Sequence, residues 1–224
     1  MSNLTLLIPA HKEAEALPEF LKELEKYEYK KLIVLQKEDV ETIDAIKNFK
    51  GIEIFTQNKK GYGNALIEGI NSIQTEFFCI INADGSMDPS YLNQMLNKCK
   101  DIDFVYTSRY LKNGGSDDDN LITFIGNKVF SKLGQIFFDL NISDILYTYV
   151  MGKTKSAQNL FLNYGDFRIC VEMPIKTHRK RYKYSSLPSK ERKRIGGVKK
   201  VNAIKDGFLI LLAMIFLYFN KKKN

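Results

Sequence analysis

Asp84 is the residue in this sequence with the strongest case for chemistry, because it lies just beyond a buried strand. An apolar run from Phe77 to Ile81 ends shortly before Asp84, and Gly85 follows. In open α/β sheets, ligands bind in the crevice outside the carboxyl ends of the strands, and a glycine there permits close backbone approach. A turn-stabilising role for the carboxylate is the alternative. Asp88 instead precedes Pro89, and we expect it to cap the helix that begins there.

Alternating strand and helix patterns predict the scaffold around this carboxylate. The predicted strands are Leu4–Ile8, Lys31–Leu35, Ile52–Phe55, Phe77–Ile81 and Phe104–Thr107, and the predicted helices are Pro18–Tyr27, Glu41–Asn48, Gly63–Ile73 and Pro89–Lys98. This rhythm is typical of an α/β fold with a mostly parallel, Rossmann-like sheet flanked by helices.

Two later segments extend this scaffold. Apolar residues at helical spacing predict a helix over Ile125–Leu140, after a flexible loop at Gly114-Gly115. We expect this helix to pack on the core, rather than form a lid or face a membrane. Phe167–Met173 alternates between apolar and polar residues, which predicts a last strand of the sheet.

The composition predicts one globular domain in a reducing compartment. The chain has 224 residues, enough for one sizeable α/β domain and a tail. Cys79, Cys99 and Cys170 are odd in number and lack C-x-x-C spacing, which argues against a disulfide framework and a zinc site. Because the first residues do not form a secretory signal, we expect the main body to be cytoplasmic.

The positive charge is concentrated at the C-terminal end. Residues 1–175 hold 19 bases and 24 acids, a net of −5, whereas residues 176–224 hold 15 bases and 2 acids, a net of +13. Such a segment fits a nucleic-acid arm, a solvated surface or a patch facing anionic lipid. The neighbouring apolar sequence favours the membrane surface, so we expect no nucleic-acid partner.

That apolar sequence runs from Gly207 to Phe219, thirteen uncharged residues before three lysines. Thirteen helical residues reach about 20 Å, whereas a hydrocarbon core is about 30 Å thick. A helix beginning near Val201 would carry Lys205 and Asp206 into the headgroup layer. We therefore expect a monotopic anchor, with a true span and a buried or oligomer helix as alternatives. The domain plan is a catalytic domain over 1–175, a basic membrane-facing segment over 176–206 and an anchor helix over 207–224.

Five motifs stand in an order that resembles a known family. They are LLIPAHKEAEALPEFL from Leu6, GYGNALIEGI from Gly61, INADGSMDPSYL from Ile81, TSRY from Thr107 and ERKRIGGVKKVN from Glu191. Together they resemble the family-2 glycosyltransferases of the GT-A fold, and within these the dolichyl-phosphate mannose or glucose synthase branch. Such enzymes transfer a sugar from a nucleotide to a polyprenyl phosphate.

The resemblance implies a donor site in the first half of the chain. Pro9, His11 and Glu13 would contact the base and ribose, with His11 in place of the family's tyrosine. Gly61 would belong to a segment that closes on the donor, although a helix-start turn explains the same glycines. A loop histidine is also commonly solvated.

The resemblance also implies a divalent cation, Mg²⁺ or Mn²⁺, at the family's Asp-x-Asp motif. Asp84 would be the main ligand, with Asn82 offering an amide oxygen and Ser86 a hydroxyl or a bound water. Because Asn82 replaces the first acid, we expect weaker metal binding. The base-binding acid after the second strand is missing as well, since the sequence there reads IVLQKEDVET from Ile33. We expect Glu38 and Asp39 to be solvated loop acids, with substitution for that acid as the alternative.

The acceptor half follows from the same resemblance. Ser108, Arg109, Arg194, Gly196 and Lys199 would hold the lipid phosphate, since arginine pairs with phosphate oxygens and glycine exposes backbone amides. Arg194 alternatively belongs only to the basic membrane patch.

One further acid belongs to the predicted catalytic set. Asp144 would line the cleft, with a turn role as the alternative, and the set is Asp84, Arg109 and Asp144.

The implied reaction is an in-line, inverting transfer of a hexose from a GDP-mannose or UDP-glucose type of donor. A lipid phosphate is mostly ionised at pH 7, so no strong base is needed. We expect the enzyme at the cytoplasmic face of a membrane, held by its C-terminal helix; the sequence leaves its oligomeric state open. The alternative is a weakly active or inactive nucleotide-sugar-binding homologue or partner subunit.

Overall fold

The computed structural model describes residues 3–197 and 201–220. The elements, in chain order, are β1 (Leu4–Pro9), α1 (Ala16–Leu24), β2 (Lys30–Leu35), α2 (Val40–Ile46), β3 (Ile52–Thr56), α3 (Tyr62–Ser72), β4 (Phe77–Ile80), a 3₁₀ turn (Pro89–Tyr91), α4 (Leu92–Cys99), β5 (Phe104–Ser108), β6 (Gly115–Ser116), α5 (Leu121–Phe138), β7 (Val150–Lys153), α6 (Thr154–Gln158), α7 (Ile169–Arg179), β8 (Tyr184–Pro188), β9 (Lys190–Glu191) and α8 (Ala203–Phe219). All five strands predicted in the first half are present within one residue at each end.

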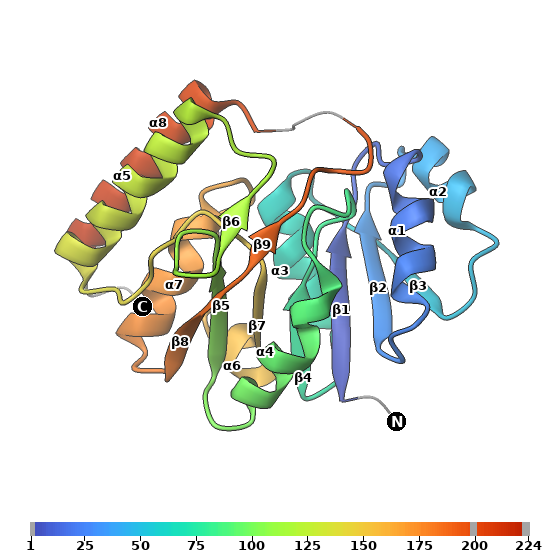
Figure 1. The fold of residues 1–224 in the computed structure, drawn as a ribbon, viewed down its shortest axis with the longest axis horizontal. Coiled ribbons are helices and arrows are strands. Elements are labelled where there is room, and N and C mark those ends of the chain that lie inside the picture. Colours follow the sequence, from blue (N-terminus) through green and yellow to red (C-terminus); the bar gives the residue numbers. More distant parts are fainter. Residues whose placement is uncertain (1–2, 198–200, 221–224) are drawn as a thin grey trace.

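Seven of the strands form one sheet in the order β3-β2-β1-β4-β7-β5-β8 (Figure 1). β1 pairs in parallel with both β2 and β4, and β5 pairs in parallel with β8. Only β7 runs antiparallel within this sheet, between β4 and β5. The strand order reverses between β1 and β4, which is the switch point where α/β sheets form ligand crevices.

The core lies on both faces of the sheet, as strand alternation requires. In β1, Leu6 and Ile8 join a cluster with helices α1 and α4, whereas Leu7 joins the opposite cluster with α3, α7 and α8. Strands buried on both faces read as continuous apolar runs. The predicted α/β class with helices on both faces is confirmed.

The strand predicted over Phe167–Met173 is wrong, because this segment begins α7. Every residue from Ile169 to Thr177 is buried. The apparent alternation came from Glu172, which is not solvated: its carboxylate lies 2.9 Å from Lys176 Nζ, one helical turn on, and accepts from two loop amides. A helix buried all round shows no apolar stripe, and spacing alone then misleads. The composition boundary at residue 175 falls inside this helix.

The predicted helix over Ile125–Leu140 is confirmed as α5, but its expected core packing is only partly right. Phe130, Leu133 and Phe138 pack against the core, while the buried residues of this helix are the polar or small Asn127, Ser131 and Gly134. Most other large apolar residues of α5 are exposed.

The apolar C-terminal sequence forms α8, which starts at Ala203 after Asn202, whose side chain accepts from Lys205 N. In the part of the chain that the structure describes, none of the helices combines the length and apolarity needed to cross a bilayer. Four residues of α8 are buried, so this helix also contributes to the core: Ile210, Ala213, Met214 and Leu217.

Candidate functional site

A cleft of about 430 Å³ opens at the carboxyl ends of β1, β3 and β4. Loops after β1 to β5 line it, together with α5, α8 and the chain after β9. The predicted residues in its lining are Pro9, His11, Glu13, Gly61, Asn82, Asp84, Ser86, Arg109 and Arg194. The structure therefore brings the whole predicted donor set to one cleft.

Three other predicted residues lie beside this cleft. Ser108 is buried and its hydroxyl shares a hydrogen bond of 2.7 Å with Ser143, while Asp144 is buried behind Arg109. Gly196 packs against the side chain of Glu15. Lys199 lies outside the described residues.

Asp84 is held by its own turn on one side and faces a cation on the other. Its Oδ1 accepts from Ser86 N at 3.0 Å and from Ser86 Oγ at 2.8 Å. Its Oδ2 lies 3.7 Å from Arg194 Nη1. The side chain of Asp84 is 13% exposed. The sequence suggested two roles for Asp84, stabilising a turn and binding a ligand. In the structure Oδ1 stabilises the turn, whereas Oδ2 is the oxygen that faces the cleft.

Asn82 is fixed by a relay of hydroxyl groups. Tyr62 Oη donates to Asn82 Oδ1 at 3.2 Å and shares a 2.7 Å hydrogen bond with Thr148 Oγ1. The Tyr62 ring stacks on Phe167 at 5.1 Å. Burial raises the pKa of Tyr62 well above its usual value, so the phenol stays protonated and able to donate. The amide oxygen of Asn82 thus has one lone pair already in use.

The side-chain oxygens of Asp84 and Asn82 fit a cation that would be bound jointly by the protein and by a phosphate-containing ligand. Within residues 3–197 and 201–220, no group of three or more His, Cys, Asp or Glu side chains is placed to hold a metal ion. Mg²⁺ commonly takes one or two protein carboxylates and completes its shell with phosphate oxygens and water. Asp84 Oδ2, aided by Asn82, matches that pattern rather than an all-protein cage.

Arg194 bridges two acids in the lining of the cleft. Its Nη2 lies 2.7 Å from Asp118 Oδ2, and its Nη1 reaches toward Asp84. The pKa of Arg194 is raised, first by the hydrogen bond with Asp118 and then, against some desolvation, by the charge of Asp84. Asp118 was not singled out in the sequence, where it follows shortly after the flexible loop predicted at Gly114-Gly115.

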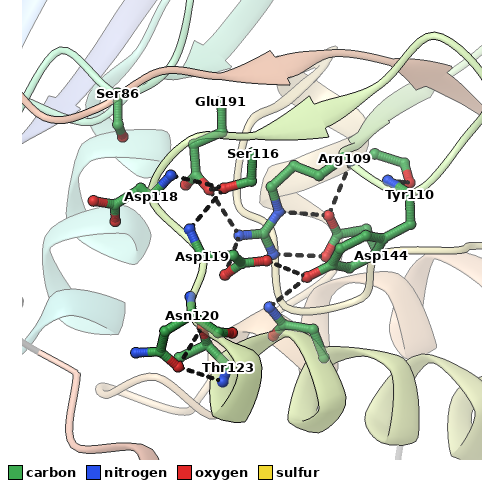
Figure 2. Close-up of polar contacts among 12 residues, drawn as sticks. Ser86, Arg109, Tyr110, Ser116, Asp118, Asp119, Asn120, Thr123, Asp144 and Glu191 are labelled. Atoms are coloured by element: carbon green, nitrogen blue, oxygen red, sulfur yellow. Dashed lines mark hydrogen bonds and ion pairs between the residues drawn. The ribbon is translucent and has the colours of Figure 1, made fainter.

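Arg109 lies at the centre of a buried acidic cluster (Figure 2). Its Nε and Nη2 donate to the two oxygens of Asp144 at 2.7 and 2.9 Å. Its Nη1 donates to Glu191 Oε2 at 3.1 Å and lies 3.5 Å from Asp119 Oδ1. Burial alone would lower the pKa of Arg109, but Asp144 and then Glu191 hold it well above its usual value. Most of its donors are therefore turned toward protein carboxylates.

Glu191 is a second residue that the sequence did not single out. It lies on β9, which pairs with β6, and its Oε2 accepts from Ser116 Oγ at 2.5 Å (Figure 2). Burial raises the pKa of Glu191, although Arg109 opposes that rise. One feature of the sequence could have indicated its role: Glu191 is an isolated acid in a strongly basic stretch. Such an acid can be buried when a cation from another part of the chain pairs with it, as Arg109 does here.

Comparison with known proteins decides the family. The model of glycosyl transferase family 2 matches residues 5–161, more than two thirds of the chain. This protein belongs to glycosyl transferase family 2. It is therefore a glycosyltransferase, as the motifs predicted.

Individual relatives of this family member are distant. It is 21% identical to glycosyltransferase AglJ from Haloferax volcanii over 98% of this chain and 72% of that protein. A glucosyl-3-phosphoglycerate synthase from Mycobacterium tuberculosis, solved with Mn²⁺, uridine diphosphate and phosphoglyceric acid, has 10% identity and a TM-score of 0.68, over 96% of this chain and 78% of that one. A mannosyl-3-phosphoglycerate synthase from Rubrobacter xylanophilus has 13% identity and a TM-score of 0.62, over 95% and 71%. These similarities confirm the predicted GT-A type of fold.

The base-binding acid expected after the second strand is absent from this family member. The nearby acids Glu38 and Asp39 were both predicted to be solvated, and the structure shows that this is wrong for Asp39. Glu38 is exposed, as expected, but Asp39 is 8% exposed and is not a solvated loop acid. Its Oδ2 accepts from Lys12 N at 2.6 Å and its Oδ1 from Thr42 Oγ1 at 2.8 Å. Asp39 therefore stabilises the loop that carries His11, while Gln36, directly after β2, lines the cleft.

The glycines before α3 have a packing explanation. A Cβ on Gly63 would lie 2.2 Å from the carbonyl oxygen of Tyr164, and one on Gly61 would lie 2.3 Å from that of Gly165. Gly61 also has a φ of 118°, which disfavours other residues. Close approach of two backbones fixes these glycines, and Gly61 still lines the cleft.

Proposed function

We propose that this glycosyltransferase moves a hexose from a nucleotide sugar, of the GDP-mannose or UDP-glucose type, to a polyprenyl or dolichyl phosphate at the cytoplasmic face of a membrane. The observation that carries the proposal is the composition of the cleft. Its lining combines Asp84 at the sheet edge, Arg194, whose Nη1 lies 3.7 Å from Asp84 Oδ2, and Ile210 of the apolar helix α8. A ligand with a phosphate and a long apolar chain matches that combination of charged and apolar side chains.

On the donor side, Pro9, His11 and Glu13 would hold the base and ribose, and Asn82 and Asp84 would face the diphosphate. A divalent cation, Mg²⁺ or Mn²⁺, held by Asp84 would neutralise the charge that develops on the leaving diphosphate. Ser86 keeps Asp84 oriented by two hydrogen bonds, so the carboxylate needs no rearrangement. The uridine diphosphate and Mn²⁺ in the Mycobacterium tuberculosis synthase support this arrangement by analogy of fold.

On the acceptor side, the cleft suits an anionic nucleophile better than a sugar hydroxyl. A hydroxyl needs a carboxylate base to take its proton, but Asp118, Asp119 and Glu191 each lie beside an arginine. A phosphate monoester has a second pKa of about 6 and is mostly dianionic at pH 7, so it attacks without that help. Arg194 would exchange Asp118 for the incoming phosphate. Arg109, held by Asp144, would supply a fixed positive charge below it.

The test is a transfer assay with two kinds of phosphate acceptor. Purified protein with Mg²⁺ or Mn²⁺ and labelled nucleotide sugars is given either a polyprenyl phosphate or phosphoglyceric acid, which is bound in the M. tuberculosis complex. We expect label in the organic phase, reduced about 100-fold or more by Asp84→Asn. Asp88→Asn is the matched control, because Asp88 only caps the turn at Pro89–Tyr91 and should retain activity. Label only in water-soluble product, or transfer indifferent to Asp84→Asn, would overturn the proposal.

Asn82 and the missing base-binding acid after the second strand favour one alternative, a weakly active nucleotide-sugar-binding homologue or partner subunit. In the pattern that the sequence resembles, an acid stands at both places. Such a protein would bind uridine or guanosine diphosphate in a titration, yet give no labelled product with either acceptor.

A further inference from the structure

Helix α5 has its polarity reversed relative to a normal surface helix. At 100° per residue, four of its exposed apolar side chains fall within an arc of about 60°, and they are Ile122, Ile125, Val129 and Ile136. The buried residues Asn127, Ser131 and Gly134 occupy an arc of similar width centred about 180° away. A helix in water places its apolar stripe inward, so the outer face of α5 is built for an apolar medium.

Helix α8 is apolar on both sides. Ile210, Ala213, Met214 and Leu217 face the protein. Outward-facing residues on the other side include Phe208, Ile215 and Phe219, of which Phe208 is 61% and Phe219 79% exposed. A helix that is apolar all round belongs either in a protein core or in a membrane. Half of α8 meets the core, and its other half needs a second apolar environment.

The two helices run alongside each other (Figure 1) and are in contact. Tyr218 of α8 packs edge-on against Phe137 and Phe138 of α5 at 5.8 and 6.1 Å, and Gly207 lies beside Phe130. Because each apolar face points away from the core that both helices touch, the faces form one outer surface. Exposed apolar surfaces of this kind mark interaction sites.

The charges around this surface select its partner. Within α5 the charged residues are Lys128 and Lys132, and Lys132 lies at the border of the apolar arc. The acids that precede α5 are engaged elsewhere: Asp118 with Arg194, Asp119 with Arg109 and Asp117 with Lys190. The C-terminal sequence that contains α8 is strongly basic, with a net charge of +13 over residues 176–224, and such sequence attracts anionic headgroups. A second copy of this chain would bring the same positive charge and be repelled.

The dimensions favour lying in the membrane surface rather than crossing it. At 1.5 Å per residue, the 17 residues of α8 extend about 25 Å, shorter than the hydrocarbon core of about 30 Å. The inner side of the pair also lines the cleft, through Thr123 and Asn127 of α5 and Ile210 of α8. A bilayer on the outer side would therefore be separated from the cleft only by this helix pair.

We infer that α5 and α8 together form a docking surface for an anionic lipid bilayer and lie flat in its interface, with the cleft opening at the membrane plane. This inference takes the membrane setting from the proposed function and adds α5 as an equal partner of the C-terminal helix. It also implies that deleting α8 is a poor test, because its buried residues belong to the core.

Single tryptophans give a direct test, since the sequence contains none. The reporters are Ile125→Trp and Ile136→Trp on α5 and Phe208→Trp on α8, and the control is Val40→Trp, an exposed residue of α2. Each variant is mixed with vesicles of phosphatidylglycerol and phosphatidylcholine that carry brominated chains, and the quenching is measured. We expect all three reporters to be quenched, more strongly by bromine near the headgroup than near the chain end, and Val40→Trp to stay unquenched.

Charge insertion gives the second measurement. The double variant Ile125→Glu with Ile136→Glu should lower partition onto these vesicles by roughly tenfold or more, while Val40→Glu should leave it unchanged. Circular dichroism and urea unfolding verify that each variant folds. Quenching confined to Phe208→Trp would overturn the role of α5. A lipid-free dimer that shields the α5 reporters and ignores vesicles would overturn the lipid assignment in favour of a second copy. Vesicle binding without label in the organic phase would support the surface and refute the lipid acceptor.

Discussion

Replacing Arg109 by methionine should lower the free energy of unfolding by about 3–5 kcal/mol at pH 7, the usual cost of removing one partner from a buried ion pair. The wild-type side chain is 7% exposed and forms a two-point pair with Asp144. Methionine keeps much of the apolar stem but leaves Asp144, Glu191 and Asp119 close together without a cation. The upper half of the range is expected, because more than one carboxylate loses its counter-charge.

The loss should depend on pH through Glu191. Burial raises the pKa of Glu191 above its ordinary value of 4.5, while Arg109 opposes the rise, so the methionine variant should raise it further. A carboxyl whose pKa is higher in the folded protein than in the unfolded chain contributes most to stability at pH values below its pKa in the unfolded chain. That contribution is lost as pH rises through the folded pKa, at about 1.4 kcal/mol per pH unit for each extra proton held. The penalty of Arg109→Met should therefore be smaller at pH 5 than at pH 7.

Urea unfolding of both proteins, followed by far-ultraviolet circular dichroism at pH 5 and pH 7, measures these differences directly. Arg168→Met is the control: Arg168 also pairs with an acid at 2.7 Å, but the two side chains are 33% and 40% exposed. An exposed pair contributes roughly 0–1 kcal/mol. The reasoning is refuted if Arg109→Met costs no more than Arg168→Met, or if its cost is equal at both pH values.

Two further substitutions test other parts of the site. Asn82→Asp should tighten Mn²⁺ binding in the presence of uridine diphosphate by about tenfold, or 1.4 kcal/mol, because it adds a carboxylate beside Asp84 while Tyr62 still donates to it; an unchanged affinity by calorimetry would contradict this. Gly63→Ala should cost about 1–3 kcal/mol in urea unfolding, because its Cβ meets the backbone of Tyr164–Asp166. Gly126→Ala, with nothing within 4 Å, should instead stabilise α5 by about 1 kcal/mol, and equal effects at the two glycines would count against the packing argument.

The sheet and the position of Asp84 were predictable because both follow from local sequence. Continuous apolar runs bounded by turn residues set the strands, and the carboxyl end of such a run has a fixed place at the sheet edge. The N-cap role of Asp88 is local in the same way and is confirmed by its 2.8 Å hydrogen bond from Ser90 N.

What the sequence did not predict depends on contacts between distant segments. Asp118 and Arg194 are 76 residues apart, and Arg109 and Glu191 are 82 apart. Their pairing requires β6 to lie beside β9, two strands of two residues each that carry no strand signal. The polarity of α5 was misjudged for a related reason, since spacing locates an apolar face without showing which side of the fold it meets.

The net charge of the cleft lining explains why the proposed reaction needs both a divalent cation and an arginine from the C-terminal part of the chain. Among the described lining residues, Glu13, Asp84, Asp118, Asp119 and Glu191 contribute −5, and Arg109 and Arg194 contribute +2, which leaves −3. A diphosphate and a phosphate both carry negative charge, so this lining alone would repel the ligands of the proposed reaction. A divalent cation at Asp84 would offset most of that excess on the donor side. On the acceptor side, Arg194 already lies between Asp84 and Asp118. An arriving phosphate, which is also negatively charged, would have to replace one of these carboxylates as the partner of Arg194. The acids of the cleft thus hold the arginines in place before the ligands bind, and the absence of a second acid at Asn82 limits the repulsion where the donor's diphosphate must enter.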